Sequence, residues 1–182
     1  MVDADLAYPI GRFQMPDRIN DSTRETFVNL IETTPIALRN AVQGLDDQQL
    51  DTPYRPGGWT IRQVVHHLPD SHMNAYIRFK LALTEQQPTI RPYDEALWAQ
   101  ISDALSGPVQ LSVDLLTCLH ARWIISIRSL PASAFDRTFK HPDLGVMSLN
   151  QQLALYAWHG PHHVAHITNL VARSGWNPNQ GA

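Results

Sequence analysis

Apolar residues recur at helical spacing along four long segments of the chain. The segments span about residues 22–45, 60–84, 112–130 and 148–175. An apolar position at every third or fourth residue is typical of a helix that buries one face. Proline and glycine punctuate the intervals between the segments. The pattern therefore predicts four amphipathic helices.

Residues at the segment ends support these boundaries. Asp21 or Ser22 is expected to cap the first helix, which should stop near Gly44. The last helix should open at Ser148, where the sequence SLNQ places Gln151 at the third position of a capping box. Four amphipathic helices of this length bury their apolar faces most economically in an all-α four-helix bundle.

Two connections stand out. Residues 85–108 form a long, proline-bearing link, so we expect a crossover or a lid at this point and not a tight turn. Sustained strand alternation is lacking in the sequence, except for a weak candidate at residues 135–147 that favours a short hairpin or an irregular loop.

Size and charge narrow the possible functions. A chain of 182 residues is long enough for one substantial core, and we expect a single domain over residues 1–182. Hydrophobic residues make up 43% and charged residues 17%, which is typical of a soluble globular protein. A net charge of −3 gives no basic field, so nucleic acid is not an expected partner.

The expected cellular location depends on sequence features of secreted and membrane proteins, which the chain lacks. The first residues, MVDADLAYPIG, lack the charged and apolar regions of a signal peptide. Apolar runs such as WIISI are far shorter than the roughly 20 residues of a membrane-spanning helix, so we expect no membrane association. The single cysteine, Cys118, fits a reducing compartment and is expected to be a small core residue. We expect a cytoplasmic protein.

Histidines are concentrated in the last helix. The stretch WHGPHHVAHI holds four of the nine histidines of the chain. On a helical wheel, His159 and His163 lie within or at the edge of the apolar stripe, His162 points elsewhere, and His166 flanks the stripe. Pro161, between the first two, removes the amide partner of the Ala157 carbonyl and should kink the helix.

The His159 and His163 pair has two physical interpretations. Two imidazoles one turn apart and directed at the bundle interior are either neutral rings with hydrogen-bond partners or ligands. A divalent transition ion suits them, because neutral imidazole is its commonest nitrogen donor. A third ligand would come from the second helix, where the spacing alone does not choose among His66, His67, Asp70 and His72. His72 is expected to pack in the core, and His120 and His141 to fill core or surface positions.

Longer motifs add a family resemblance. The matching segments are YPIGRF, LDTPYRPGGWTIRQVVHHLPDSHMNAYIRFKLALTE, PTIRPYDEALW and YAWHGPHHVAHIT. With them the chain resembles the DinB superfamily, and in particular its YfiT-like branch of metal-dependent hydrolases. The resemblance implies an up-down-down-up bundle, a homodimer, and a metal held by His67, His159 and His163. Val164 and Ala165 replace an arginine and a glycine found in other branches, which removes any basis for borrowing their substrate contacts.

Three protein ligands would leave the ion an open position for chemistry. A bound water whose pKa is lowered toward about 7 would support hydrolysis of a small-molecule substrate. The ion could instead deprotonate a thiol, which would make the protein an S-transferase for a small thiol such as bacillithiol or glutathione. A third alternative is a non-catalytic, metal-stabilised binding module, closed by a fourth ligand such as His166 or Asp70.

The sequence does not determine the identity of the metal or of a catalytic acid or base. We expect one ion per chain and favour zinc, although nickel, manganese and iron also suit three imidazoles. An HExxH-type glutamate is lacking, and the sequence assigns no catalytic residue. Polar groups that could approach the site are Asp70, Tyr93, Asp94 and Glu95, each of which could equally serve as a cap, an ion-pair partner or an orienting group. Arg55 and Arg91 could receive a substrate carboxylate or stay solvated in their loops.

Overall fold

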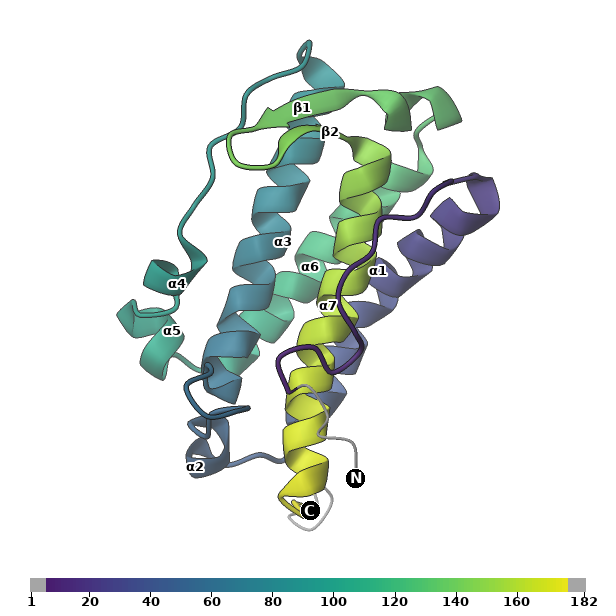
Figure 1. Cartoon of the computed structure of the whole chain (residues 1–182). Coiled ribbons are helices and arrows are strands. Elements are labelled where there is room, and N and C mark those ends of the chain that lie inside the picture. The colour runs from purple at the N-terminus through teal and green to yellow at the C-terminus, as the bar shows by residue number, and fades with distance from the viewer. Residues whose placement is uncertain (1–5, 177–182) are drawn as a thin grey trace.

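Four long helices form most of the computed structural model, which describes residues 6–176. They are α1 (Asp21–Val42), α3 (Ile61–Thr84), α6 (Val109–Arg128) and α7 (Leu149–Arg173). Helices α1 and α3 each pack against both α6 and α7. Helices α1 and α7 run in one direction and α3 and α6 in the other (Figure 1). The predicted four-helix bundle with up-down-down-up connection is confirmed.

Because α3 and α6 are parallel, the chain between them must return along the length of the bundle. It does so through residues 85–108, which carry the short helices α4 (Glu95–Trp98) and α5 (Ser102–Ser106) (Figure 1). Both short helices pack against α3. The predicted crossover is therefore present, and a four-residue helix, α2 (Asp47–Leu50), precedes α3.

A small antiparallel hairpin lies between α6 and α7. It follows the 3-10 helix η1 (Ala132–Asp136) and consists of β1 (Thr138–His141) and β2 (Gly145–Ser148), with Thr138 opposite Ser148. The hairpin covers one end of the bundle (Figure 1). Of the two interpretations of residues 135–147, the hairpin is the one that the structure adopts.

Helix ends follow the local chemistry of the sequence. Ser148 and Gln151 form the predicted capping box of α7, and Thr60 and Gln63 form a second one at α3. The predicted cap of the first helix, Asp21 or Ser22, is wrong, because Asn20 caps α1 and its side chain accepts from the Thr23 amide. Gly44 has a φ of 76°, which glycine adopts without strain, and the helix has ended by this point.

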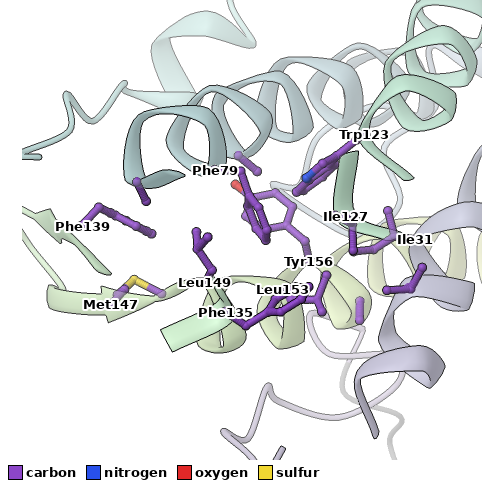
Figure 2. Close-up of a cluster of buried hydrophobic side chains, with 14 of the residues drawn as sticks. Ile31, Phe79, Trp123, Ile127, Phe135, Phe139, Met147, Leu149, Leu153 and Tyr156 are labelled. Carbon is purple, nitrogen blue, oxygen red and sulfur yellow. The ribbon is translucent and has the colours of Figure 1, made fainter. Parts of the chain in front are cut away.

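The core divides into two apolar clusters. The one nearer the hairpin contains Phe79, Trp123 and Tyr156 (Figure 2). The other, toward α2, contains Leu68 and Leu116 with other aliphatic residues of all four long helices. Between the clusters, the long helices carry several histidines: His72 on α3 and His120 on α6 are buried, and His159 and His163 on α7 are partly buried. The middle of the bundle therefore contains polar side chains between two apolar clusters.

The expectation that Cys118 is a core residue is wrong, because its side chain is exposed. It belongs to a stripe along the outer face of α6 with Leu111, Leu115 and Ile125, which are 68%, 43% and 73% exposed. Apolar character alone did not distinguish this outer stripe from the buried one. Within residues 6–176, no helix is both long enough and apolar enough to span a membrane.

Candidate metal centre

The three ligands predicted from the sequence lie together at mid-bundle. His67 on α3 and His159 on α7 are 92 residues apart in the chain, yet their Nε2 atoms are 3.3 Å apart. His163 joins them, and one nitrogen from each of the three rings lies within 4.8 Å of the others. The structure thus brings the predicted residues together, and their binding of an ion stays a prediction.

Local packing holds these rings in place. His159 and His163 are one turn apart on α7, with ring centroids separated by 4.5 Å. Trp59, in the loop before α3, packs on His67 at a centroid distance of 4.8 Å. The site is therefore built from one helix pair and a loop that follows a tight turn. Gly58 allows that turn, because a Cβ there would lie 2.8 Å from Cγ of Arg55.

The electrostatics favour neutral rings. Burial lowers the pKa of His67 to about 4. Burial, with the neighbouring imidazoles as a smaller cause, lowers the pKa of His159 and His163 well below the ordinary value. Neutral imidazole offers the lone pair that a transition ion requires. Three converging neutral nitrogens fit zinc or a similar divalent ion. The three donors are uncharged.

Two further histidines of α7 are buried beside the cluster. The Nε2 atoms of His162 and His166 are 3.1 Å apart, and these rings form a second histidine group with His163. On the wheel His162 points outside the apolar stripe, yet its side chain is buried in the structure. Tyr8, from the N-terminal segment that crosses α7 (Figure 1), and Trp158 pack on the His162 ring at centroid distances of 6.0 and 4.2 Å. Trp158 is one turn away on the same helix, but Tyr8 is remote in sequence, so helical periodicity could not reveal its part in this burial.

A cavity of about 470 Å³ opens beside the cluster. Its walls include His67, His159 and His163, with three of the polar residues proposed from the sequence, namely Arg55, Tyr93 and Glu95. Asp70, Arg91 and Asp94 are not among the residues that line it. Asp94 caps α4, with its side chain accepting from the Leu97 amide at 2.9 Å. Asp70 is half-buried, and desolvation followed by the charge of Asp103 raises its pKa to about 6.

Other wall residues escaped the sequence reasoning. Tyr8, Tyr54 and Ser71 line the same cavity. The Ser71 hydroxyl is hydrogen-bonded to the Tyr156 hydroxyl at 3.3 Å and also contacts the Tyr93 hydroxyl. All three belong to segments that carry the family resemblance, Tyr8 to YPIGRF, and Tyr54 and Ser71 to LDTPYRPGGWTIRQVVHHLPDSHMNAYIRFKLALTE. Neither segment by itself indicates that these side chains line one cavity.

The remaining histidines are held by other hydrogen bonds. His66 faces away from the cluster, as the wheel indicated, and bonds to Ser112 Oγ at 2.7 Å and to the Gly107 carbonyl at 3.1 Å. His72 is fully buried in the core, as expected. His120 and His141 are also buried, and neither belongs to a histidine group of the described chain that could hold an ion.

Fold and cluster together define a four-helix-bundle protein with three imidazoles from its second and last long helices at the wall of an open cavity. A family model described as the DinB superfamily matches residues 30–167. The chain belongs to this superfamily.

Individual relatives agree with this membership. A Bacillus subtilis protein named "Putative metal-dependent hydrolase YfiT" is 48% identical, with 97% of this chain and 100% of the relative covered. A hydrolase named in the same way from Oceanobacillus iheyensis is 50% identical over 93% of this chain and 98% of its own. The solved structure of YfiT superimposes with a TM-score of 0.92 at 48% identity, covering 94% of this chain and 99% of that one. A four-helix bundle protein at 20% identity and a TM-score of 0.52 shares the fold alone.

Proposed function

We propose that this protein is a metal-dependent hydrolase whose ion is held by His67, His159 and His163. The observation that carries the proposal is the convergence of three imidazoles from two helices at the wall of a cavity. The names of the relatives support it, since they describe metal-dependent hydrolases at about half identity over nearly the whole chain. We propose one ion per chain, with zinc favoured and nickel, manganese or iron also compatible with the ligands.

When bound, such an ion supplies Lewis acidity, which polarises a substrate carbonyl and makes water acidic enough to react near neutral pH. The chain supplies the surroundings. A cavity of about 470 Å³ suits a small-molecule substrate. Within it, Arg55 brings a positive charge that can pair with a substrate carboxylate, and its Nε donates to the Tyr54 hydroxyl at 3.2 Å.

Two wall residues are suited to proton chemistry. Burial, the largest cause, raises the pKa of Tyr93 above its ordinary value, so its hydroxyl stays protonated and can donate to a substrate oxygen. Glu95 is exposed at the cavity and presents a carboxylate that can accept a proton. We propose Glu95 as the general base and Tyr93 as the hydrogen-bond donor of the reaction.

The number of histidines in the group favours a catalytic metal site over a structural one. A structural zinc is closed by four protein ligands. Among the described residues, the group around His67 contains only three, and the potential fourth ligands lie elsewhere. His166 groups with His162 and His163, and Asp70 belongs to neither histidine group. A position left open by three ligands would be accessible from the cavity, because His67, His159 and His163 line its wall.

Turnover of a chromogenic ester by the metal-loaded protein tests the proposal. The assay is run with and without small thiols, with chelator, and with His163→Ala as the inactive control. We expect ester cleavage that needs the metal and does not need a thiol. Turnover that depends on the thiol would instead establish the S-transferase, for which Arg55 could hold the carboxylate of the thiol. No turnover under any condition would reject both reactions for this substrate class.

We also propose that the protein is a homodimer, as the family resemblance implies. The outer stripe of α6 supports this, because Leu111, Leu115 and Ile125 expose apolar surface that water disfavours. Ile36 of α1, 54% exposed, and Ile125 line a shared groove beside the stripe. A second copy packed along α6 would cover both.

The single, unpaired Cys118 fits the reducing, cytoplasmic location that we propose.

A further inference from the structure

Three consecutive hydrogen bonds lead from His159 across the whole bundle. His159 Nδ1 lies 3.2 Å from His72 Nε2, and His72 Nδ1 lies 2.8 Å from His120 Nε2. His120 Nδ1 in turn lies 2.6 Å from the backbone oxygen of Ile31. Each of the four long helices thus contributes one residue, from α7 through α3 and α6 to α1. We call His72, His120 and the Ile31 carbonyl the histidine chain.

The far end of the histidine chain is fixed by a proline. In a regular helix, the Ile31 carbonyl would accept from the amide of the residue four positions later. That residue is Pro35, which lies inside α1 and has no amide hydrogen. The carbonyl is therefore left available for His120. Since a carbonyl oxygen only accepts, His120 must donate to it from Nδ1.

This one constraint determines the proton positions along the histidine chain. A neutral imidazole carries one N–H, so His120 Nε2 accepts and His72 Nδ1 donates to it. His72 Nε2 then accepts, and His159 must donate to it from Nδ1. Neutral rings are expected here because His72 and His120 are 0% and 2% exposed. The opposite direction would place a nitrogen lone pair against the Ile31 oxygen at 2.6 Å.

We infer that His72 and His120 are positioning residues, which fix the tautomer and the ring orientation of His159. With its proton on Nδ1, His159 keeps its lone pair on Nε2, the atom that lies 3.3 Å from His67 Nε2. The inference deepens the proposed function, because it assigns the groups that prepare one ligand of the same centre. Such outer partners of a ligating imidazole raise metal affinity by about 10- to 100-fold.

The neighbouring ligand shows the contrast. His163 Nδ1 is buried and has no hydrogen-bond partner among the described residues. Of the two ligands on α7, His159 is therefore the one whose protonation site is set by the fold. We expect His159 to be the ligand that is already prepared before an ion arrives.

The direct test is a long-range ¹H–¹⁵N spectrum of the ¹⁵N-labelled, metal-free, full-length protein, which distinguishes the two neutral tautomers of each histidine. Signals are assigned by their loss in His72→Gln, His120→Gln and His159→Gln. We expect His120, His72 and His159 all to carry the proton on Nδ1. An Nε2–H tautomer or a charged ring at any of the three would overturn the inference. Because no ion is present, the result does not depend on whether the protein is a hydrolase.

Zinc affinity, measured by competition with a chromogenic chelator, tests the consequence. His72→Leu removes the acceptor and should weaken binding about 10- to 100-fold, whereas His72→Gln keeps an acceptor and should restore most of it. His66→Leu is the matched control, since it is the same change on the same helix and also removes two hydrogen bonds, at a residue that does not line the cavity. Equal losses in His72→Leu and His66→Leu, or no recovery in His72→Gln, would overturn the inference. If His72→Leu fails to fold, the tautomer spectrum decides alone.

Discussion

Gly160 on α7 packs directly against Thr34 on α1. A Cβ at Gly160 would lie 2.6 Å from Thr34 Oγ1 and 2.7 Å from Thr34 Cγ2, closer than atoms of this kind approach. Thr34 is buried and has little freedom to move, because its hydroxyl donates to the Leu30 carbonyl at 2.7 Å. The residue between His159 and Pro161 is therefore a glycine so that α1 can approach the helix that carries two of the predicted ligands.

Gly160→Ala should destabilise the protein. Alanine favours the helix by up to about 1 kcal/mol, but overpacking a core contact costs about 1–3 kcal/mol, so we expect a net loss in urea unfolding. Adding Thr34→Ala removes both clashing atoms and should recover part of the loss. A Gly160→Ala protein as stable as the wild type would show that the contact between α1 and α7 is not tight.

The metal-free protein should lose stability as the pH falls from about 7 to about 5. Burial lowers the pKa of His67 and His120 to about 4, while an unfolded histidine titrates near 6.5. Between these values the unfolded state binds more protons, so acid favours unfolding. Urea unfolding at about pH 7.5 and about pH 5 measures the difference. Equal midpoints at both pH values would contradict the burial of neutral rings.

Asp70 should have the opposite effect on the pH dependence of stability from that of the buried histidines. Burial, with Asp103 as a smaller cause, raises its pKa to about 6, so its charge weakens the folded state once the pH exceeds the unfolded value of about 4. The penalty grows up to about pH 6 and then stays constant. Asp70→Asn should therefore be more stable than the wild type at about pH 8, and the gain should shrink at about pH 4.5. A gain that is the same at both pH values would rule out the charge as its cause.

Ile125→Arg should weaken the proposed dimer. Ile125 is 73% exposed on the outer stripe of α6, and a charge there opposes burial against a second copy. Light scattering after size exclusion should give a dimer mass for the wild type and a monomer mass for the variant. Leu144→Arg, at the 63% exposed turn of the hairpin, is the matched control and should stay dimeric. A wild type that elutes as a monomer would reject the dimer.

The sequence predicted what depends on local chemistry. Helical periodicity gave the four long helices, and Ser148 with Gln151 marked the start of α7. The i, i+4 spacing of His159 and His163 placed both rings on one face, and the structure brings His67 to them. Such features follow from neighbours in the chain, which a sequence displays directly.

Relationships between distant elements were not accessible in this way. Tyr8, which is remote in sequence, packs on the buried His162. Cys118 lies on an outer face of α6 that is itself apolar, so hydrophobicity did not reveal its exposure. The bond between His72 and His120 depends on how α3 and α6 are rotated about their axes, which periodicity leaves open. The resemblance supplied His67 as the third ligand where spacing alone offered four candidates.

Metal content of the purified protein tests the central claim most directly, by elemental analysis of the wild type, His163→Ala and His141→Ala. His141 is a histidine of the hairpin, outside both histidine groups and the cavity, and serves as the control. We expect about one transition ion per chain in the wild type and in His141→Ala, and none in His163→Ala. A His163→Ala protein that is folded and still holds an equal amount of metal would contradict the account.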